Sequence, residues 1–231
     1  MLVLFPEGFE EADRGPRLEL AAYTDERGER RAKREFGDVL MSEVPADWEE
    51  RWKRFHRPVT IAGLWIGPPW EEQDGGEHAV VIDPGRAFGT GSHATTRLCV
   101  ELLAELPRTS LLDVGCGSGV LAIAAAKLGF APVLGVDHDA AAVEAAARNA
   151  AANGVEVDVR RADATAEDLP EAETAVANIN ERLVAAVGAR VGCSTLVTSG
   201  YFEPHVPALA GFRRVDRRTR DGWAADVYAR E

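Results

Sequence analysis

The sequence predicts an α/β fold in which a doubly wound, mainly parallel sheet of seven strands ends in an antiparallel hairpin. Three observations support this fold class. From Leu111 onward, short apolar segments alternate with Ala-rich helical segments, which is typical of βαβ units. A glycine-rich turn follows the first apolar segment and leads into the first helical one. Further along, Asp221 and Gly222 separate two strand-like segments, as in a β-hairpin.

The alternation gives the elements of the sheet in chain order. Parallel strands are predicted at 111–114, 133–137, 155–163, 174–179 and 194–200. The helices between them are predicted at 120–129, which Gly129 closes, at 139–154, with Asp139 as N-cap and Gly154 at its end, and at 181–188. The two hairpin strands around Asp221 and Gly222 complete the seven.

The first section of the chain, residues 1–45, is charged and rich in turn-forming residues. Leu18, Leu20 and Ala22 alternate with other side chains as in a strand, and the segment 24–29 predicts a turn. We expect a small α+β region here, shortened relative to a complete recognition domain.

The second section, residues 46–82, holds four of the five tryptophans and is expected to be a linker. Within it, Trp48, Trp52 and Phe55 are spaced so that they share one helical face, which would dock onto the next domain. The third section, residues 83–231, contains the predicted sheet and the motifs discussed below. It is expected to be the catalytic domain.

Composition excludes several classes of protein. The formal net charge is −12 and the pI is about 5.0, so a protein that mainly grips nucleic acid is disfavoured. Three cysteines without CxxC or zinc-ligand spacing argue against a disulfide framework and a metal site. The N-terminus lacks the basic region of a signal peptide, and no apolar run reaches the length of about 18 residues that a membrane span requires. We expect a soluble cytoplasmic protein, and favour a monomer.

The strongest chemical signal is LLDVGCGSG, residues 111–119, in which three glycines follow a strand and open a helix. Glycines in this position let a ligand approach the backbone at a helix N-terminus. Asp137 ends the next predicted strand, where a carboxylate accepts hydrogen bonds from ribose hydroxyls. A plain tight turn is the alternative, but the carboxylate favours a nucleotide-like cofactor.

The glycine spacing indicates which cofactor. The dinucleotide fingerprint GxGxxG would require glycine at position 120, where the chain has Val120. GxGxG preceded by Asp113 instead resembles the first motif of methyltransferases that use S-adenosylmethionine (SAM), which places Gly115 and Gly117 beside SAM. Asp163, after the third predicted strand, lies where that class holds the adenine amino group. A surface-loop carboxylate is the alternative for Asp163.

The segment VANIN, residues 176–180, ends the fourth predicted strand beside this site. We expect the side-chain carbonyl of Asn178 to accept a hydrogen bond from the target amine or from the cofactor. The alternative is an asparagine that only caps the following helix. Amino-methyltransferases that act on bases or glutamine carry two prolines after this position, and the chain has neither, so nucleobase methylation is disfavoured.

The loop DPGRAFGTGSHATT, residues 83–96, first suggests phosphate binding. A triphosphate loop needs lysine after its last glycine, whereas Gly91 is followed by Ser92 and His93. Thr95 is expected to begin a helix whose core face carries Leu98, Leu102 and Leu106. Together with LLDVGCGSGVLAIAAAKLG, GVDHD and VANI, the loop resembles the ribosomal protein L11 methyltransferase family, whose hallmark is FGTG-x-H-x-TT ahead of the first glycine motif. The resemblance covers about residues 46–231.

This resemblance implies the class I SAM-dependent methyltransferase fold and methylation of amino groups on a ribosomal protein. It carries SAM contacts over onto four positions, with Phe88 and Thr90 in the loop over the cofactor; the four are Thr96, Gly115, Asp137 and Asn178. Three departures from the family pattern are visible: Ala94 replaces proline, Asn180 replaces an apolar residue, and residues 1–45 are too few for the family's complete N-terminal recognition domain.

The expected reaction is in-line transfer of the sulfonium methyl to a protein amine, with lysine as acceptor. His93 is considered either as a general base or as a residue that orients the loop. The chain has no GxSxG elbow, which disfavours a hydrolase. Two alternatives stay open: the same chemistry on another protein or a small amine, because the recognition region is short, and a SAM-binding module without turnover.

Overall fold

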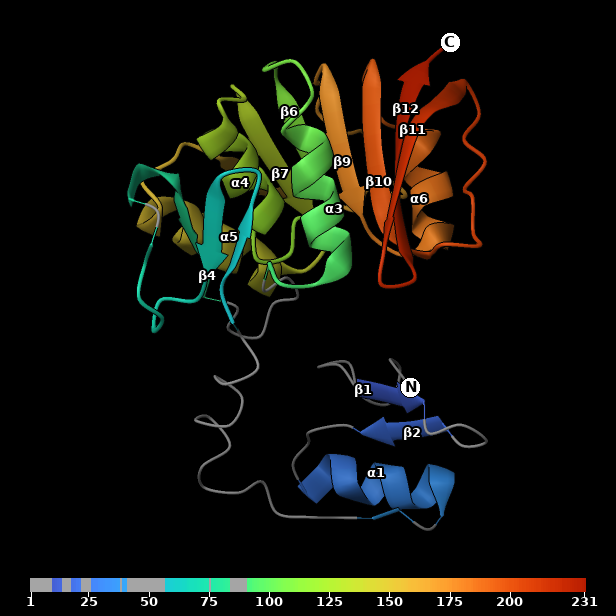
Figure 1. The fold of residues 1–231 in the computed structure, drawn as a ribbon. Helices are drawn as coiled ribbons and strands as arrows, with labels where there is room; N and C mark the ends of the chain where they lie inside the picture. Colours follow the sequence, from blue (N-terminus) through green and yellow to red (C-terminus); the bar gives the residue numbers. More distant parts are fainter. Residues whose placement is uncertain are drawn as a thin grey trace. The chain divides into compact units, whose positions relative to one another are not determined.

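The computed structural model describes residues 10–13, 18–21, 26–37, 39–40, 57–74, 76–83 and 91–231. The chain divides into two compact units, Met1–Glu49 and Glu50–Glu231, which are described separately (Figure 1). Trp48, Trp52 and Phe55, predicted to share a helical face, lie outside the described residues.

In the first unit, β1 (Glu10–Asp13) pairs antiparallel with β2 (Leu18–Ala21), and α1 (Glu26–Phe36) follows. The turn predicted at 24–29 is wrong, because α1 begins within it. The segment from Glu26 is rich in Arg, Lys and Glu, which favour helix, and Lys33 pairs with Glu29 one turn away at 2.6 Å. These preferences outweigh Gly28, a residue type that favours turns.

The second unit contains the seven-stranded sheet, with strand order β11-β12-β10-β9-β6-β7-β8. Five strands are parallel, and β12 runs antiparallel between β10 and β11. This arrangement confirms the predicted fold class and the C-terminal hairpin. The strands are β6 (Leu111–Val114), β7 (Val133–Asp137), β8 (Asp158–Arg161), β9 (Thr174–Asn178), β10 (Thr195–Phe202), β11 (Phe212–Arg220) and β12 (Trp223–Arg230).

Helices cover both faces of this sheet (Figure 1). On one face lie α3 (Ala94–Leu103), α4 (Val120–Leu128) and α5 (Ala140–Ala152), and on the other lies α6 (Glu181–Gly188). Successive residues of β6 point to opposite faces, so Leu111 packs in the core beneath α3 and α4, while Leu112 packs in the core beneath α6. The sheet is therefore doubly wound.

A second, smaller sheet was not predicted. It consists of β3 (Val59–Ile61), β4 (Leu64–Gly67) and β5 (Ala79–Val81), with the 3-10 helix η1 (Gly76–His78) before β5. The strand β4 pairs antiparallel with β3 and parallel with β5. Its fully buried side chains, such as Ile66, belong to the same core as α3 and α4. Much of the segment expected to be a linker therefore contributes to the core of the second unit.

The boundaries of β8, β10 and α3 differ from the prediction. The strand β8 is shorter than 155–163, because it lies at the sheet edge and its residues are mostly exposed. The strand β10 runs on to Phe202, since β12 continues to pair with it beyond Gly200. Leu106 lies beyond the end of α3, although it still packs against the core as expected.

Candidate active site

A cavity of about 580 Å³ lies where β6, β7 and β9 end. This is the edge at which doubly wound sheets bind ligands, and the volume suits a molecule of cofactor size. The residues that line it range in sequence from His93, just before α3, to Trp223, at the start of β12. The cavity brings together six residues predicted from the sequence: Thr96, Gly115, Gly117, Asp137, Asp163 and Asn178.

The glycine turn, residues 115–119 after β6, contributes to the lining of the cavity. The amides of Gly115 and Cys116 donate to the carbonyl oxygen of Val136 at 2.8 and 3.0 Å, which ties the turn to the end of β7. Gly115 has a φ of 73°, and a Cβ at this position would lie 2.6 Å from Ile179 Cγ2. Only glycine adopts this φ and fits this close contact without strain. Gly115 therefore presents its backbone, with no side chain, to the cavity.

Asp137 joins the glycine turn to the helix that follows β7. Its Oδ2 accepts from the Gly117 amide and its Oδ1 from the Asp139 amide, both at 3.0 Å. The side chain of His138 also approaches Oδ1, at 3.3 Å. A carboxylate oxygen accepts more than one hydrogen bond, so Asp137 retains capacity for hydroxyl groups of a ligand.

Thr96 and Asn178 also line the cavity. Thr96 lies in the first turn of α3 and is buried, and Asn178 is the last residue of β9. The amide nitrogen of Asn178 donates a long hydrogen bond of 3.5 Å to Thr96 Oγ1. Among the described residues none donates to Asn178 Oδ1. The side-chain carbonyl is thus the part of Asn178 that remains for a ligand.

The helix following β9 is capped by another residue. Asn180 is the N-cap of α6, and its Oδ1 accepts from the Leu183 amide at 3.1 Å. The alternative that Asn178 serves as the cap is therefore wrong. Asn180 also lines the cavity, as Asn178 does, so the polar departure from the family pattern stabilises a helix terminus at the site.

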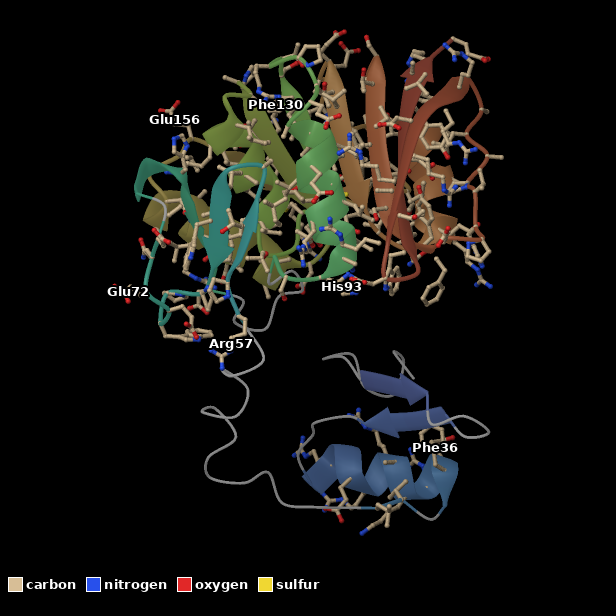
Figure 2. All side chains as sticks on the ribbon, in the orientation of Figure 1. Phe36, Arg57, Glu72, His93, Phe130 and Glu156 are labelled. Atoms are coloured by element: carbon tan, nitrogen blue, oxygen red, sulfur yellow. The ribbon has the colours of Figure 1, made fainter. Side chains whose placement is uncertain are left out.

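His93 is the N-cap of α3 (Figure 2). Its Nδ1 accepts from the Thr95 amide at 3.4 Å and lies 2.8 Å from Thr95 Oγ1. Burial lowers the pKa of the His93 imidazole from its usual value, which favours the neutral ring. These contacts are those of a residue that caps and orients the start of α3.

Trp223 borders the cavity beside His93, and Phe202 packs on Trp223. Trp223, the first residue of β12, meets the His93 ring edge to face, with 4.9 Å between ring centroids. Phe202, at the end of β10, stacks on the Trp223 ring with 4.4 Å between ring centroids, and its side chain is exposed. The sequence did not reveal this wall, because Trp223 reaches the site only through the pairing of β12 with β10.

Two other carboxyl groups differ in environment. Asp163 is exposed at the cavity edge, where hydrogen bonds from the side chain and amide of Thr165 lower its pKa. Asp113 is buried at the base of the glycine turn, and desolvation raises its pKa to about 7 despite a hydrogen bond from the Ala122 amide at 3.0 Å. The charge of Asp137 contributes further to this rise.

Some predictions lie outside these observations. Phe88 and Thr90 are not among the described residues, so their contacts with a cofactor stay predictions. Within the described ranges, no group of three or more His, Cys, Asp or Glu side chains is arranged to hold a metal ion. In the same part of the chain, every helix is too short or too polar to cross a bilayer.

Sequence reasoning also missed the apolar residues of the cavity. Ile179, Leu183 and Val187 line it together with Trp223. The spacing of Leu183 and Val187 along the helix after VANIN is a signal that could have indicated their common face. No comparable local signal exists for Trp223.

The doubly wound sheet, the glycine turn and the acidic residue after the second strand define a class I SAM-dependent methyltransferase, and SAM is the cofactor of that class. Residues 17–202 match the family model of ribosomal protein L11 methyltransferase (PrmA). The chain belongs to the ribosomal protein L11 methyltransferase family.

Individual relatives agree with this assignment. The chain is 44% identical over 192 residues to a ribosomal protein L11 methyltransferase of Symbiobacterium thermophilum, covering 80% of this chain and 62% of the relative. It is 43% identical over 148 residues to that of Caldicellulosiruptor bescii, covering 62% and 49%. The crystal structure of a ribosomal protein L11 methylase from Lactobacillus delbrueckii subsp. bulgaricus matches with a TM-score of 0.63 and 30% identity, covering 73% of this chain and 95% of that chain. The chain spans about half to three fifths of the length of these two curated relatives.

Proposed function

We propose that this protein transfers methyl groups from SAM to lysine amino groups of ribosomal protein L11. The observation that carries the proposal is the cavity of about 580 Å³ itself, which is lined by the glycine turn, Asp137 and the Thr96–Asn178 pair. The relatives at 44% and 43% identity are named ribosomal protein L11 methyltransferases. The acceptor in this proposal is taken from the names of the relatives, and methyl transfer from SAM is inferred from the residues that line the cavity.

The cavity residues suit the parts of SAM. The Asp137 carboxylate would hold the ribose hydroxyls, and Asp163, at the cavity edge, would face the adenine amino group. The glycine turn would lie along the cofactor, while the Thr96 hydroxyl would face its methionine end.

The protein's task is to place and deprotonate the acceptor. SAM supplies a methyl group that is already activated, so alignment of the amine is the main requirement. Asn178 Oδ1 would accept a hydrogen bond from the incoming amine and orient its lone pair towards the methyl group. Ile179, Leu183 and Trp223 provide apolar surface that disfavours a charged ammonium, which lowers the pKa of a lysine from about 10.4 and releases its proton to water.

The proposal is tested by incubating the purified protein with methyl-labelled SAM and either ribosomal protein L11 or a cell lysate. Label on L11 supports the proposal. Label only on another protein or a small amine would show that the chemistry is right and the acceptor wrong. Binding of SAM with no transfer in either mixture would instead indicate a SAM-binding module.

The role of Asn178 is tested by Asn178→Ala. We expect kcat for methyl transfer to fall at least about tenfold, because the amine loses its orienting acceptor, while SAM affinity changes much less. Asn180→Ser is the matched control: it alters the neighbouring asparagine but keeps a capping oxygen for α6. Equal losses of kcat in the two variants would contradict the assignment.

A further inference from the structure

Two asparagines, Asn149 of α5 and its C-cap Asn153, bind the backbone of the last strand of the small sheet and of the segment that follows it. Asn153 accepts from the Val81 amide and donates to the Val81 carbonyl, both at 2.7 Å. One helical turn earlier, Asn149 accepts from the Asp83 amide and donates to the Asp83 carbonyl, both at 3.2 Å. Because Val81 and Asp83 are two residues apart, their backbone groups face the same side, and the two amides pair with them as a neighbouring strand would.

Asn149 differs from Asn153 in one respect. Its Nδ2 also donates to the carbonyl oxygen of Ser118 at 2.8 Å, inside the glycine turn. Asn153 instead donates to the Asn149 carbonyl of its own helix at 2.7 Å. Each asparagine side chain thus makes three hydrogen bonds, but only that of Asn149 reaches the turn that lines the cavity. Asn149 is also almost fully buried, at 4% exposure.

The glycine turn is held from two directions. On the cavity side, its amides bond to Val136 and Asp137. On the other side it rests on α5, where a Cβ at Gly119 would lie 3.0 Å from the Cβ of Ala146. Ala146 is one turn before Asn149, so packing and a hydrogen bond from the same face of α5 fix the back of the turn.

We propose that Asn149 is a positioning residue for SAM binding, which holds the Ser118 peptide and thereby sets the backbone of residues 115–119 against the cofactor. The inference rests on the proposed function. Asn149 does not line the cavity, so it acts through the turn rather than by touching the cofactor. Its hydrogen bonds to Asp83 link the same turn to the residue that follows the small sheet.

The test compares Asn149→Ala with Asn153→Ala in the full chain. Both variants lose three side-chain hydrogen bonds from the same helix, so both should lower the melting temperature. We expect Asn149→Ala to raise the Kd for SAM by calorimetry about tenfold, whereas Asn153→Ala stays near the wild type. Asn149→Ser, a milder truncation that also removes the link to Ser118, replaces the alanine variant if the latter does not fold.

A second measurement does not depend on the cofactor. Hydrogen exchange of the amides in residues 115–120 should be faster without SAM in the Asn149 variant than in the Asn153 variant. Equal Kd values and equal exchange in the two variants would overturn the inference and assign Asn149 a purely structural role. A wild type that fails to bind SAM would overturn the proposed function instead, and is recognised before any variant is compared.

Discussion

The acidic residue Asp113 illustrates how burial changes a single side chain. Its carboxyl group is at most 1% exposed, and its pKa is raised from 3.8 to about 7. In the unfolded chain the group ionises near its ordinary value, so between these two values the folded protein binds more protons than the unfolded one. Stability from this group is therefore greatest at low pH and falls as pH rises towards about 7.

The first prediction follows from that sign. Asp113→Asn keeps an acceptor for the Ala122 amide but cannot ionise. The variant should gain stability over the wild type as pH rises from about 4 to 7, at up to about 1.4 kcal/mol for each unit of pKa difference. Urea unfolding at several pH values measures this. A stability difference that does not change with pH would show that Asp113 titrates normally.

Asp137 gives a second prediction at the same scale. Asp137→Ala removes the proposed ribose ligand and leaves the Gly117 and Asp139 amides without their acceptor, so the Kd for SAM should rise about tenfold or more. Asp158→Ala is the control, because Asp158 is exposed on β8 and forms an ion pair with the exposed Arg160. Calorimetry that finds equal effects would refute the ribose role.

At the scale of elements, the contact between the start of α3 and β4 yields a third prediction. Gly91 has a φ of 86°, and a Cβ there would lie 2.4 Å from Cγ2 of the buried Ile66. Gly63 also has positive φ, 80°, but open space around it. Gly63→Ala should cost about 1 to 2 kcal/mol for backbone strain alone. Gly91→Ala should cost about 1 to 3 kcal/mol more, because the core must shift.

Denaturant unfolding of the two glycine variants separates these contributions. The difference in free energy of unfolding measures the packing of the residues before α3 onto the small sheet. If both substitutions cost the same, Ile66 yields freely and the small sheet does not fix the start of α3.

The elements that were predicted correctly are those whose pattern is local. The strands β6, β7 and β9 are short apolar segments between helices, so their sequence alone identifies them. The strands β3 to β5 have only three or four residues each, and Gly63 lies between β3 and β4. The sequence of this segment therefore resembles that of a loop. The helix α1 was also missed, because its first turn contains Gly28, which favours turns, although its charged side chains favour helix.

The residues of the candidate site also divide into those with a local sequence signal and those without one. Gly115, Gly117 and Asp137 could be predicted, because each follows a strand that the pattern identifies. Trp223 could not, since it reaches the cavity only when β12 pairs with β10, far away in sequence. His93 could be placed near the site, but its capping of α3 depends on backbone geometry that the sequence leaves open.

At the scale of the whole molecule, the two units differ in what they should contribute. The described residues that line the cavity all belong to Glu50–Glu231. We therefore expect a fragment of residues 50–231 to bind SAM within about twofold of the full chain, because a compact unit retains its own core. Calorimetry on the fragment is the measurement. Loss of SAM binding in a folded fragment would mean that the first unit takes part in the cofactor site.

The sheet order also bears on what protects the sheet edge. Within the described sheet, β12 lies between β10 and β11, so β11 pairs with no strand but β12. A chain in which the hairpin of β11 and β12 is detached has an open edge on β10. Such an edge can recruit strands from other chains. The docked hairpin therefore also shields β10 from pairing with another molecule.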